Sequence, residues 1–246
     1  MADDTGSDPQ PVEERDEQGR IVRSGEMRDE LFHGLFTAYG EDGHPILRAR
    51  LRAGKLHGEV RNYAPGGALV QVAEYAEGVQ HGQTTFYANA RPTCRMTYRD
   101  GLLNGPSVFF HESGTVAAVF QYCDGKREGE ALFHSPQGRP MRRENYANDR
   151  LHGPVLGYYD DGTVSERAAF LDGLQDGVLR RFFPSGALMQ HGVYRRGLLI
   201  EPLRTYSEDG KEIAVLHPPA GGGGEIIATG TRQRLAQCRI GGLARH

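Results

Sequence analysis

Four histidines share one position in a repeated phrase of the sequence, which raises the question of a metal site. Each stands directly before a glycine: His33, His57, His81 and His152. If the phrase recurs on every second strand of a sheet, equivalent imidazoles lie about 10 Å apart. One ion cannot bridge that gap, because His nitrogens bind zinc at about 2.0–2.1 Å. Other repeats fill the position with Asn104, Glu128 and Asp176. The sequence therefore indicates a tolerant turn position, and we expect no metal site.

Other residues with reactive side chains are also arranged as turns or linkers. His111, Glu112 and Ser113 have the types of a nucleophile relay, but consecutive turn residues cannot line up as nucleophile, base and orienting group. The segment 160–162 (DDG) lacks the spaced carboxylates of a calcium loop. The glycines 221–224 lack the Lys-Ser/Thr of a phosphate-binding loop. We expect no catalytic residues, no cofactor and no enzymatic activity.

Glycines recur about every 24 residues and organise most of the chain. The first series is Gly34, Gly58, Gly82, Gly105, Gly129, Gly153 and Gly177, with one step of 23. The second series is Gly43, Gly67, Gly114, Gly138, Gly162, Gly186 and Gly210, with Arg91 at the missing place. The third is Gly54, Gly78, Gly101, Gly125, Gly173 and Gly197, with Asp149 in the gap. Fixed self-similarity at this length is typical of a repeat array, whose units must pack on their neighbours.

Two rows of aromatic residues keep the same period. The first row is Tyr39, Tyr63, Tyr87, Phe110, Tyr158, Phe182 and Tyr206, with His134 as the departure. The second row is Tyr75, Tyr98, Tyr122, Tyr146, Phe170 and Tyr194, headed by Leu51. We expect at least one row to pack the inner face of a sheet, since each large aromatic can bury about 150–250 Å². A row that faces solvent would instead form a tyrosine-rich contact strip.

The local chemistry predicts one β-hairpin in each repeat. The glycines fall in phrases such as 65–67 (PGG), 112–114 (ESG) and 208–210 (EDG), where a positive φ costs glycine little. The stretches between them are short and rich in Tyr, Phe and Val, and none sustains helical spacing. We read all three glycine series as turns. The predicted fold is all-β: seven to eight stacked hairpins in one elongated antiparallel sheet.

These motifs carry a resemblance to MORN-repeat proteins. The segment 54–59 (GKLHGE), followed by Tyr63, Gly67 and Tyr75, resembles the MORN unit in its bacterial variant form, including that of the YwqK-type antitoxins. The resemblance covers about residues 20–216. The chain departs from the usual pattern in having no tryptophan and in losing glycines at Arg91, Asp149 and Glu201. The resemblance implies a stack of β-hairpins and a non-catalytic binding role.

Composition divides the chain into three parts. Residues 1–30 carry ten acids against four arginines, residues 31–216 balance at 21 against 21, and residues 217–246 carry four arginines and one glutamate. We expect an acidic disordered leader over 1–18, the repeat array over 19–216, and a Pro/Gly linker with a weakly basic tail over 217–246. Within the tail, residues 232–238 could form a short helix.

The sequence favours a cytoplasmic location. Cys94, Cys123 and Cys238 have no CxxC spacing and cannot all pair, which favours reduced thiols. The acidic start is followed by no apolar segment of the kind found in secretory signals. No run approaches the roughly 18 apolar residues of a membrane span.

Paired arginines are the candidate partner contacts. They gather in the C-terminal half: Arg142, Arg143, Arg180, Arg181, Arg195 and Arg196. Such pairs could bind an acidic protein surface, anionic lipid or phosphate. The alternative is that they are solvated and balanced by nearby acids such as Glu144 and Glu166. A nucleic-acid partner is disfavoured, because the array is close to neutral.

These observations predict a non-catalytic protein-binding repeat protein. The YwqK-type resemblance implies an antitoxin or immunity protein that blocks a cognate toxin. The broader MORN resemblance implies an alternative, a membrane-associated scaffold that binds anionic phospholipid. A third reading is a structural part of a larger assembly. The partner, the binding face and the oligomeric state stay open at this point, although an open sheet has two edge strands that dimerisation could cap.

Overall fold

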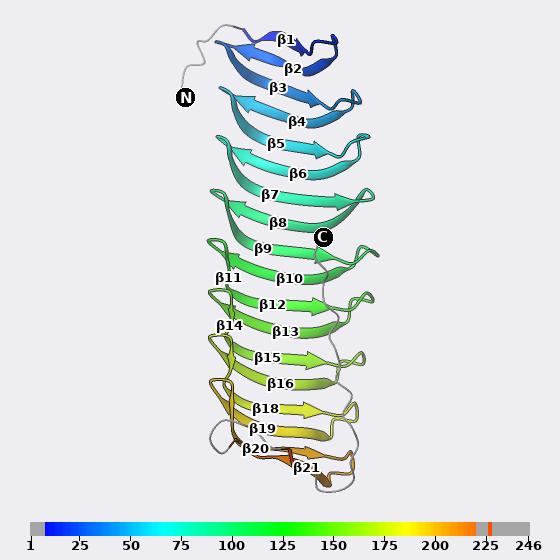
Figure 1. The fold of residues 1–246 in the computed structure, drawn as a ribbon, viewed down its shortest axis with the longest axis vertical. Helices are drawn as coiled ribbons and strands as arrows, with labels where there is room; N and C mark the ends of the chain where they lie inside the picture. Colours follow the sequence, from blue (N-terminus) through cyan, green and yellow to red (C-terminus); the bar gives the residue numbers. More distant parts are fainter. Residues whose placement is uncertain (1–7, 220–225, 228–246) are drawn as a thin grey trace.

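The computed structural model describes residues 8–219 and 226–227, and these residues form one open antiparallel sheet (Figure 1). The strands are β1 (Gln10–Arg15), β2 (Ile21–Arg28), β3 (Leu31–Tyr39), β4 (Pro45–Arg52), β5 (Lys55–Tyr63), β6 (Leu69–Ala76), β7 (Val79–Ala88), β8 (Arg91–Arg99), β9 (Leu102–Phe110), β10 (Val116–Cys123), β11 (Lys126–Arg127), β12 (Gly129–His134), β13 (Pro140–Ala147), β14 (Arg150–Leu151), β15 (Gly153–Tyr158), β16 (Val164–Leu171), β17 (Leu174–Gln175), β18 (Gly177–Phe182), β19 (Leu188–Arg195), β20 (Leu198–Tyr206), β21 (Glu212–Leu216) and β22 (Ile226–Ile227). The predicted fold class is confirmed.

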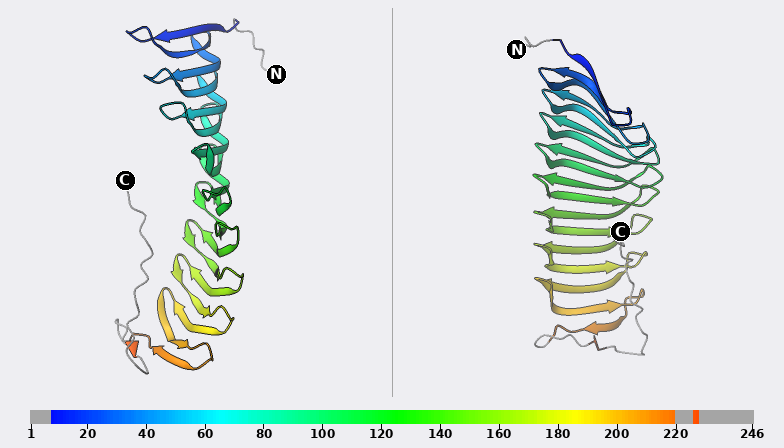
Figure 2. Two further views of the ribbon diagram at one scale, coloured as in Figure 1. Left: turned by 90° about the vertical axis from the view of Figure 1, so that its right-hand side faces the viewer. Right: turned by 45° about the horizontal axis from the view of Figure 1, so that its top comes forward.

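Each strand pairs with the strand that precedes it and the strand that follows it in the chain. Three strands of this meander are interrupted: β11 and β12 both pair with β10, β14 and β15 with β13, and β17 and β18 with β16. The described residues thus form nine hairpins, from β1–β2 to β20–β21. Figure 2 shows that the stack is long and twisted, with strands that curve across its width and no closure into a barrel.

The sheet begins earlier than we predicted from the acidic composition. β1 lies inside the predicted leader and pairs with β2 from Gln10 opposite Met27 to Arg15 opposite Ile21. Its acidic side chains are compatible with a strand because they meet arginines: Glu14 lies 3.1 Å from Arg23. The prediction of disorder over residues 8–18 is therefore wrong, and the additional hairpin explains why nine are found. Residues 1–7 lie outside the described part.

At the other end, β21 ends at Leu216, the boundary that the sequence set for the repeat array. The tail contributes β22, which pairs Ile226 with Leu216 and Ile227 with Val215. Most of the linker and tail that we predicted over 217–246, including the possible helix over 232–238, lies outside the described residues.

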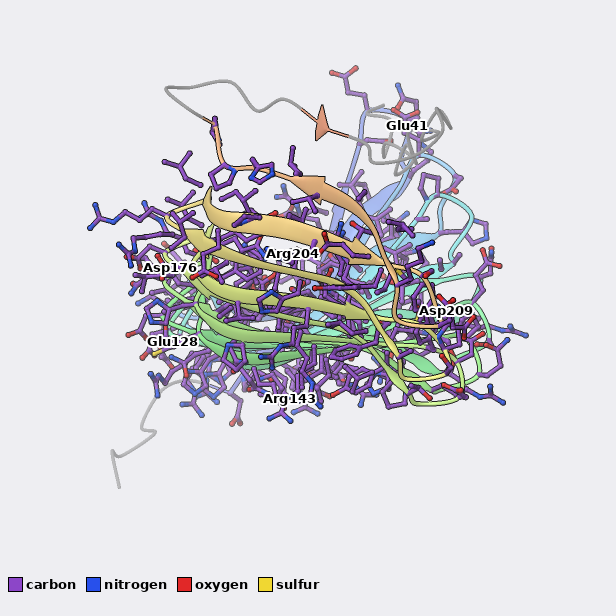
Figure 3. All side chains as sticks on the ribbon, turned by 90° about the horizontal axis from the view of Figure 1, so that it is seen from below. Glu41, Glu128, Arg143, Asp176, Arg204 and Asp209 are labelled. Carbon is purple, nitrogen blue, oxygen red and sulfur yellow. The ribbon has the colours of Figure 1, made fainter. Side chains whose placement is uncertain are left out.

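Two kinds of turn lie at opposite edges of the sheet. At one edge, the second glycine series closes longer turns, as where Gly67 N–H donates to the Ala64 carbonyl at 2.9 Å. At the other edge, two-residue turns place both residues at positive φ, as in Asp124 (47°) and Gly125 (85°). Figure 3, viewed along the stack, shows Asp209 at the first edge and Glu128 and Asp176 at the second. Both series are turns, as predicted.

The two gaps in the glycine series have local explanations. Asp149 keeps the glycine conformation with φ of 67°, and its side chain accepts a 2.9 Å hydrogen bond from Arg127 N–H. At Arg91, the long turn is replaced by a two-residue turn in which Asn89 and Ala90 have φ of 50° and 60°. This shorter turn accounts for the single repeat step of 23 residues.

The first glycine series lies within or at the start of strands, so the prediction that these glycines form turns is wrong. Their φ values lie between 81° and 115°. Around Gly58, Val60 and Leu56 pair with Ala49 and Leu51, so the pairing register shifts between β4 and β5. Such an irregularity is a β-bulge, which a positive-φ glycine permits. A glycine in a bulge and a glycine in a turn share the same backbone requirement, which is why the sequence pattern could not separate them.

Each of these glycines lies directly across from a residue of the second aromatic row or its head. The pairs are Gly34–Leu51, Gly58–Tyr75, Gly82–Tyr98, Gly105–Tyr122, Gly129–Tyr146, Gly153–Phe170 and Gly177–Tyr194. Aromatic residues placed opposite strand glycines compensate for the missing side chain. The first glycine series and the second aromatic row are therefore the two members of one repeated cross-strand pair.

The small core lies along the middle of one face, which we call the buried face. Its central row holds residues of at most 9% exposure, and the fully enclosed ones include Ala73, Val155 and Ala131. Val155, Ala168 and Leu179 form a continuous cluster on which Phe170 and Tyr194 of the second aromatic row pack. The second row therefore packs the inner face, as we expected of at least one row.

The first aromatic row lies on the opposite face, which we call the arginine face. Arginine side chains lie over its rings: Arg48 over Tyr63 at 5.8 Å, Arg95 over Phe110 at 5.8 Å and Arg167 over Phe182 at 6.0 Å. The rings are half-buried. Guanidinium groups therefore lie over three rings of the row that could have formed an open tyrosine strip.

Candidate binding face

The structure separates the members of two arginine pairs onto opposite faces. Arg142 and Arg143 are consecutive in β13, and Arg180 and Arg181 are consecutive in β18. Successive strand residues point to opposite sides of a sheet. Arg142 and Arg181 lie on the buried face, and Arg143 and Arg180 lie on the arginine face. Neither pair forms one basic patch.

On the buried face, the arginines are neutralised within the chain. Arg142 Nε donates to Glu144 Oε1 at 2.5 Å, and Arg142 Nη1 lies 3.5 Å from Glu166 Oε1. Glu166 also accepts from Arg181 at 2.9 Å. Arg142 reaches Glu166 across Gly157, which pairs with both residues and has no side chain. We call Arg142, Glu144, Glu166 and Arg181 the polar ladder. Its two arginines and two glutamates neutralise one another, so this part of the face offers little to a charged partner.

Tyr146 closes one end of the polar ladder. Its hydroxyl donates to Glu144 Oε2 at 2.6 Å, and Arg127 lies over its ring at 4.3 Å. Partial burial, followed by the hydrogen bond to Glu144, raises the pKa of Tyr146 to about 12. The phenol is therefore held in its neutral, donating form.

On the arginine face, four basic residues lie directly opposite one another on four neighbouring strands. Arg167 pairs with Arg180, Arg180 with His191, and His191 with Arg204. We call these four residues the arginine row. Like charges placed directly across a sheet repel and destabilise it. The directly opposed Arg167 and Arg180 therefore lower the stability of the sheet rather than raise it.

The middle of the arginine row has no acidic partner among the residues that the structure describes. Arg204 donates to Glu212 Oε2 at 2.6 Å, and Arg143, further along the same face, pairs with Glu130. No carboxylate lies within ion-pair distance of Arg167, Arg180 or His191 in the described part of the chain. Figure 3 shows Arg143 projecting beneath the ribbon in that view. Uncompensated positive charge is concentrated on β16 and β18, at Arg167 and Arg180, with the His191 imidazole beside them on β19.

Apolar surface borders the arginine row on both sides. Val178 lies two residues from Arg180 on the same face, is 40% exposed and pairs with Val193. Toward the longer turns, Arg167 and Phe182 line a cleft of about 160 Å³. A cleft of about 330 Å³ lies further along, between Leu132, Arg143 and Tyr158 among others. The row therefore combines fixed charge with flanking pockets that could take apolar side chains.

The remaining predicted pair lies at the edge of the sheet. Arg195 ends β19, and Arg196 begins a two-residue turn with φ of 50°. The backbone N–H of Arg196 donates to Asp176 Oδ2 at 2.9 Å. The structure therefore does not bring this pair together with the arginine row.

The histidine position connects neighbouring repeats. His81 Nδ1 lies 3.3 Å from Asp100, and His57 and His152 face Glu77 and Asp172 in the same way. Where the position changes, the contact changes with it: Asn104 donates to Asp124, Glu128 accepts from Asn148 N–H, and Asp176 accepts from Arg196 N–H. These inter-repeat contacts give the repeated position a structural role.

The other candidate residues occupy turns. His111 Nε2 lies 2.9 Å from the His134 carbonyl, and Ser113 Oγ lies 2.9 Å from Thr115 Oγ1, so neither group faces the other. Within residues 8–219 and 226–227, no three His, Cys, Asp or Glu side chains are grouped to hold a metal ion. Cys94 and Cys123 are free thiols. Among the described residues, no helix has the length and apolar character needed to cross a membrane.

Sequence reasoning missed Arg167, His191 and Arg204. Their signal is the repeat period: Arg143, Arg167 and His191 are spaced by 24 residues, and so are Arg180 and Arg204. Arginines that are adjacent in the chain point to opposite faces of a sheet. Side chains instead contact the residues directly opposite them on the neighbouring strands.

Comparisons with known proteins give no family. No family model and no curated protein matches the chain. Among solved structures, a mutant of S. aureus TarM, bound to fondaparinux, α-GlcNAc-glycerol and UDP, is 11% identical with a TM-score of 0.24. That match covers 48% of this chain and 19% of TarM. A TcdB2–TccC3–Cdc42 structure is 10% identical with a TM-score of 0.20, over 89% of this chain and 14% of the other. The chain thus spans less than a fifth of either neighbour, and likeness at this level carries no functional argument.

Proposed function

We propose that this chain is a non-catalytic binding protein that holds a protein partner on the arginine face of its C-terminal repeats. The observation that carries the proposal is the set of Arg167, Arg180 and His191, aligned on three neighbouring strands without a carboxylate partner in the described residues. The repulsion within this row is relieved when a partner supplies negative charge.

The architecture supports binding because it holds these side chains on a stiff support. The strands beneath the arginine row are joined by backbone pairing and by the inter-repeat contacts at Asp176 and His152. A preformed surface loses little conformational entropy when a partner docks. The flanking residues Val178 and Phe182 offer apolar contacts beside the charges, a combination typical of protein interfaces.

The MORN and YwqK-type resemblance makes neutralisation of a toxin the specific form of this function that we propose. In that role the arginine face would cover an acidic surface at or near the active site of the toxin. Co-expression tests this form: the product of a neighbouring gene should arrest growth alone, and the wild-type chain should restore it. A chain with Arg180→Glu should restore growth poorly, whereas Arg95→Glu should act as the wild type does.

Arg95 is a matched control because it lies on the same face and stacks on Phe110 as Arg167 stacks on Phe182. Its cross-strand neighbours are Thr85 and Val108, so it is not part of a row of like charges.

A pull-down tests the general function: the tagged full chain, as wild type and as each variant, is used to capture its partner from an extract of the source cells. We expect one protein to be retained by wild type and Arg95→Glu and lost with Arg180→Glu. Identical recovery with all three chains would refute the proposed face.

The arginine row also makes anionic phospholipid the alternative ligand. Sedimentation with vesicles containing phosphatidylserine, over a series of salt concentrations, separates the two. A lipid-binding scaffold should bind at low salt and lose binding as salt screens the charges. A protein-binding array should leave the vesicles unoccupied while still retaining its partner.

A further inference from the structure

We infer that the arginine row receives the acidic face of an α-helix that lies along the long axis of the sheet, across the strands. This inference rests on the proposed function and specifies the chemistry and secondary structure of the partner. It is carried by the charge of the row, by the spacing of its members and by the surface on either side.

The charge of the row calls for several carboxylates at once. Arg167 and Arg180 are directly opposed, and Arg180 is followed by His191 and Arg204 on the next two strands. Only Arg204 has an acidic partner, Glu212, in the described residues. A partner with acids in a line would relieve the repulsion between Arg167 and Arg180 and would also offer acceptors to His191 and Arg204. The partner should therefore present a linear set of carboxylates.

The spacing of the row favours a helix over an extended strand. Neighbouring strands are about 4.8 Å apart, so the three steps from Arg167 to Arg204 span about 14 Å. Acids on one face of a helix repeat every turn of about 5.4 Å, or about 16 Å over three steps. Acids on one side of an extended strand repeat about every 6.7 Å, or about 20 Å. A helix therefore differs from the row by about 2 Å and a strand by about 6 Å, so the helix needs the smaller adjustment of the arginine side chains.

The surface beside the row fits the apolar positions that flank an acidic stripe on such a helix. Val178 and Val193 lie along one side, and the cleft of about 160 Å³ at Phe182 lies along the other. Residues three or four positions apart share a helix face, so leucines next to the acids would reach both sides.

The same surface is less suited to a single-stranded nucleic acid. Binding of that kind uses free aromatic faces on which bases stack. Here Arg167 lies over the Phe182 ring and covers the nearest such face.

The test uses labelled peptides and the full chain, with binding followed by fluorescence anisotropy at low salt. The helical peptide carries Glu at positions i, i+4, i+7 and i+11 of one face, with leucines beside them. A second peptide has the same composition with the acids spread around the helix, and a third has a central proline that breaks the helix at constant charge. A single-stranded oligonucleotide of equal charge and phosphatidylserine vesicles serve as competing ligands.

We expect the helical peptide to bind wild type and Arg95→Glu equally, and to bind Arg180→Glu or Arg167→Glu about tenfold or more weakly. The scrambled and proline peptides should bind wild type more weakly than the helical one. Equal binding of the helical and proline peptides would overturn the helix, and equal binding by Arg95→Glu and Arg180→Glu would overturn the row. Tighter binding of the oligonucleotide or vesicles would assign the row to those ligands. If a natural partner is lost with Arg180→Glu but the peptides show no helix dependence, this inference fails and the proposed function stands.

Discussion

The phenol of Tyr146 donates a hydrogen bond of 2.6 Å to Glu144, two residues before it on β13, and Glu144 is only 7% exposed. The same carboxylate accepts from Arg142 at 2.5 Å. A buried carboxylate is tolerated only when it is paired and hydrogen-bonded. The buried face can therefore carry the charge of Glu144 because Tyr146 and Arg142 both donate to it. The same two contacts leave that carboxylate unavailable to a partner.

Replacing Glu144 with leucine should destabilise the array. Arg142 and Tyr146 then lose their acceptor, and we expect the free energy of unfolding to fall by about 1–3 kcal/mol, since Arg142 keeps Glu166 and some access to water. The double variant Arg142→Met/Glu144→Leu should recover part of this loss, because it also removes the guanidinium that Glu144→Leu leaves without its partner. Urea unfolding measures both. A double variant no more stable than the single one would show that the polar ladder is not the cause.

The pH dependence of stability should include a step from Tyr146. Its pKa in the folded chain is raised to about 12, so the folded state keeps the proton more tightly than the unfolded state, in which tyrosine titrates near pH 10. This contribution to stability is complete below about pH 10 and is lost as the pH rises toward 12. Thermal unfolding of wild type and Tyr146→Phe should differ in slope only in that window. Parallel curves would contradict the raised pKa.

The bulge glycines should resist substitution more than their neighbours do. Gly105 has φ of 104°, and a Cβ there would meet Thr97 at an ordinary 3.5 Å, so backbone strain is the main cost. We expect Gly105→Ala to lower the free energy of unfolding by about 1–3 kcal/mol. Asn104→Ala, which removes one exposed hydrogen bond to Asp124, should cost less than about 1 kcal/mol. Equal unfolding midpoints for the two variants would rule out the strained bulge.

Asp149 should be replaceable by glycine more readily than by alanine. Its φ of 67° costs an ordinary residue about 1–2 kcal/mol, so Asp149→Gly should be more stable than Asp149→Ala by about that amount.

The hydrogen bond from Arg127 N–H also holds the pKa of the Asp149 carboxyl below its usual range. That contribution is present above about pH 4 and is lost as the pH falls through the folded-state pKa. The advantage of wild type over Asp149→Asn, in urea at several pH values, should therefore shrink in acid.

The fold was predictable because its two periodic signals have one cause. Glycines such as Gly129 face aromatics such as Tyr146 in six of the seven pairs, so their common spacing reveals the hairpin stack. The acidic strand β1 was not predictable from composition, because Glu14 is accommodated by Arg23 on the next strand. The composition of the segment does not show this contact, because it depends on the register in which β1 pairs with β2.

The candidate site was predictable only in part. Arg143 and Arg180 were chosen because each adjoins a second arginine, yet that second arginine points to the other face and meets Glu144 or Glu166. The residues that extend the row, Arg167 and His191, stand alone in the sequence. They become visible only when positions 24 residues apart are compared, which requires the register of the strands.

The arginine face can be tested directly by footprinting with an arginine-selective reagent, followed by mass spectrometry of the full chain with and without its purified protein partner. The account predicts that the partner protects Arg167, Arg180 and Arg204, while Arg48 and Arg95 on the same face react equally in both samples. Unchanged reactivity at all five arginines, or protection confined to Arg48 and Arg95, would contradict it.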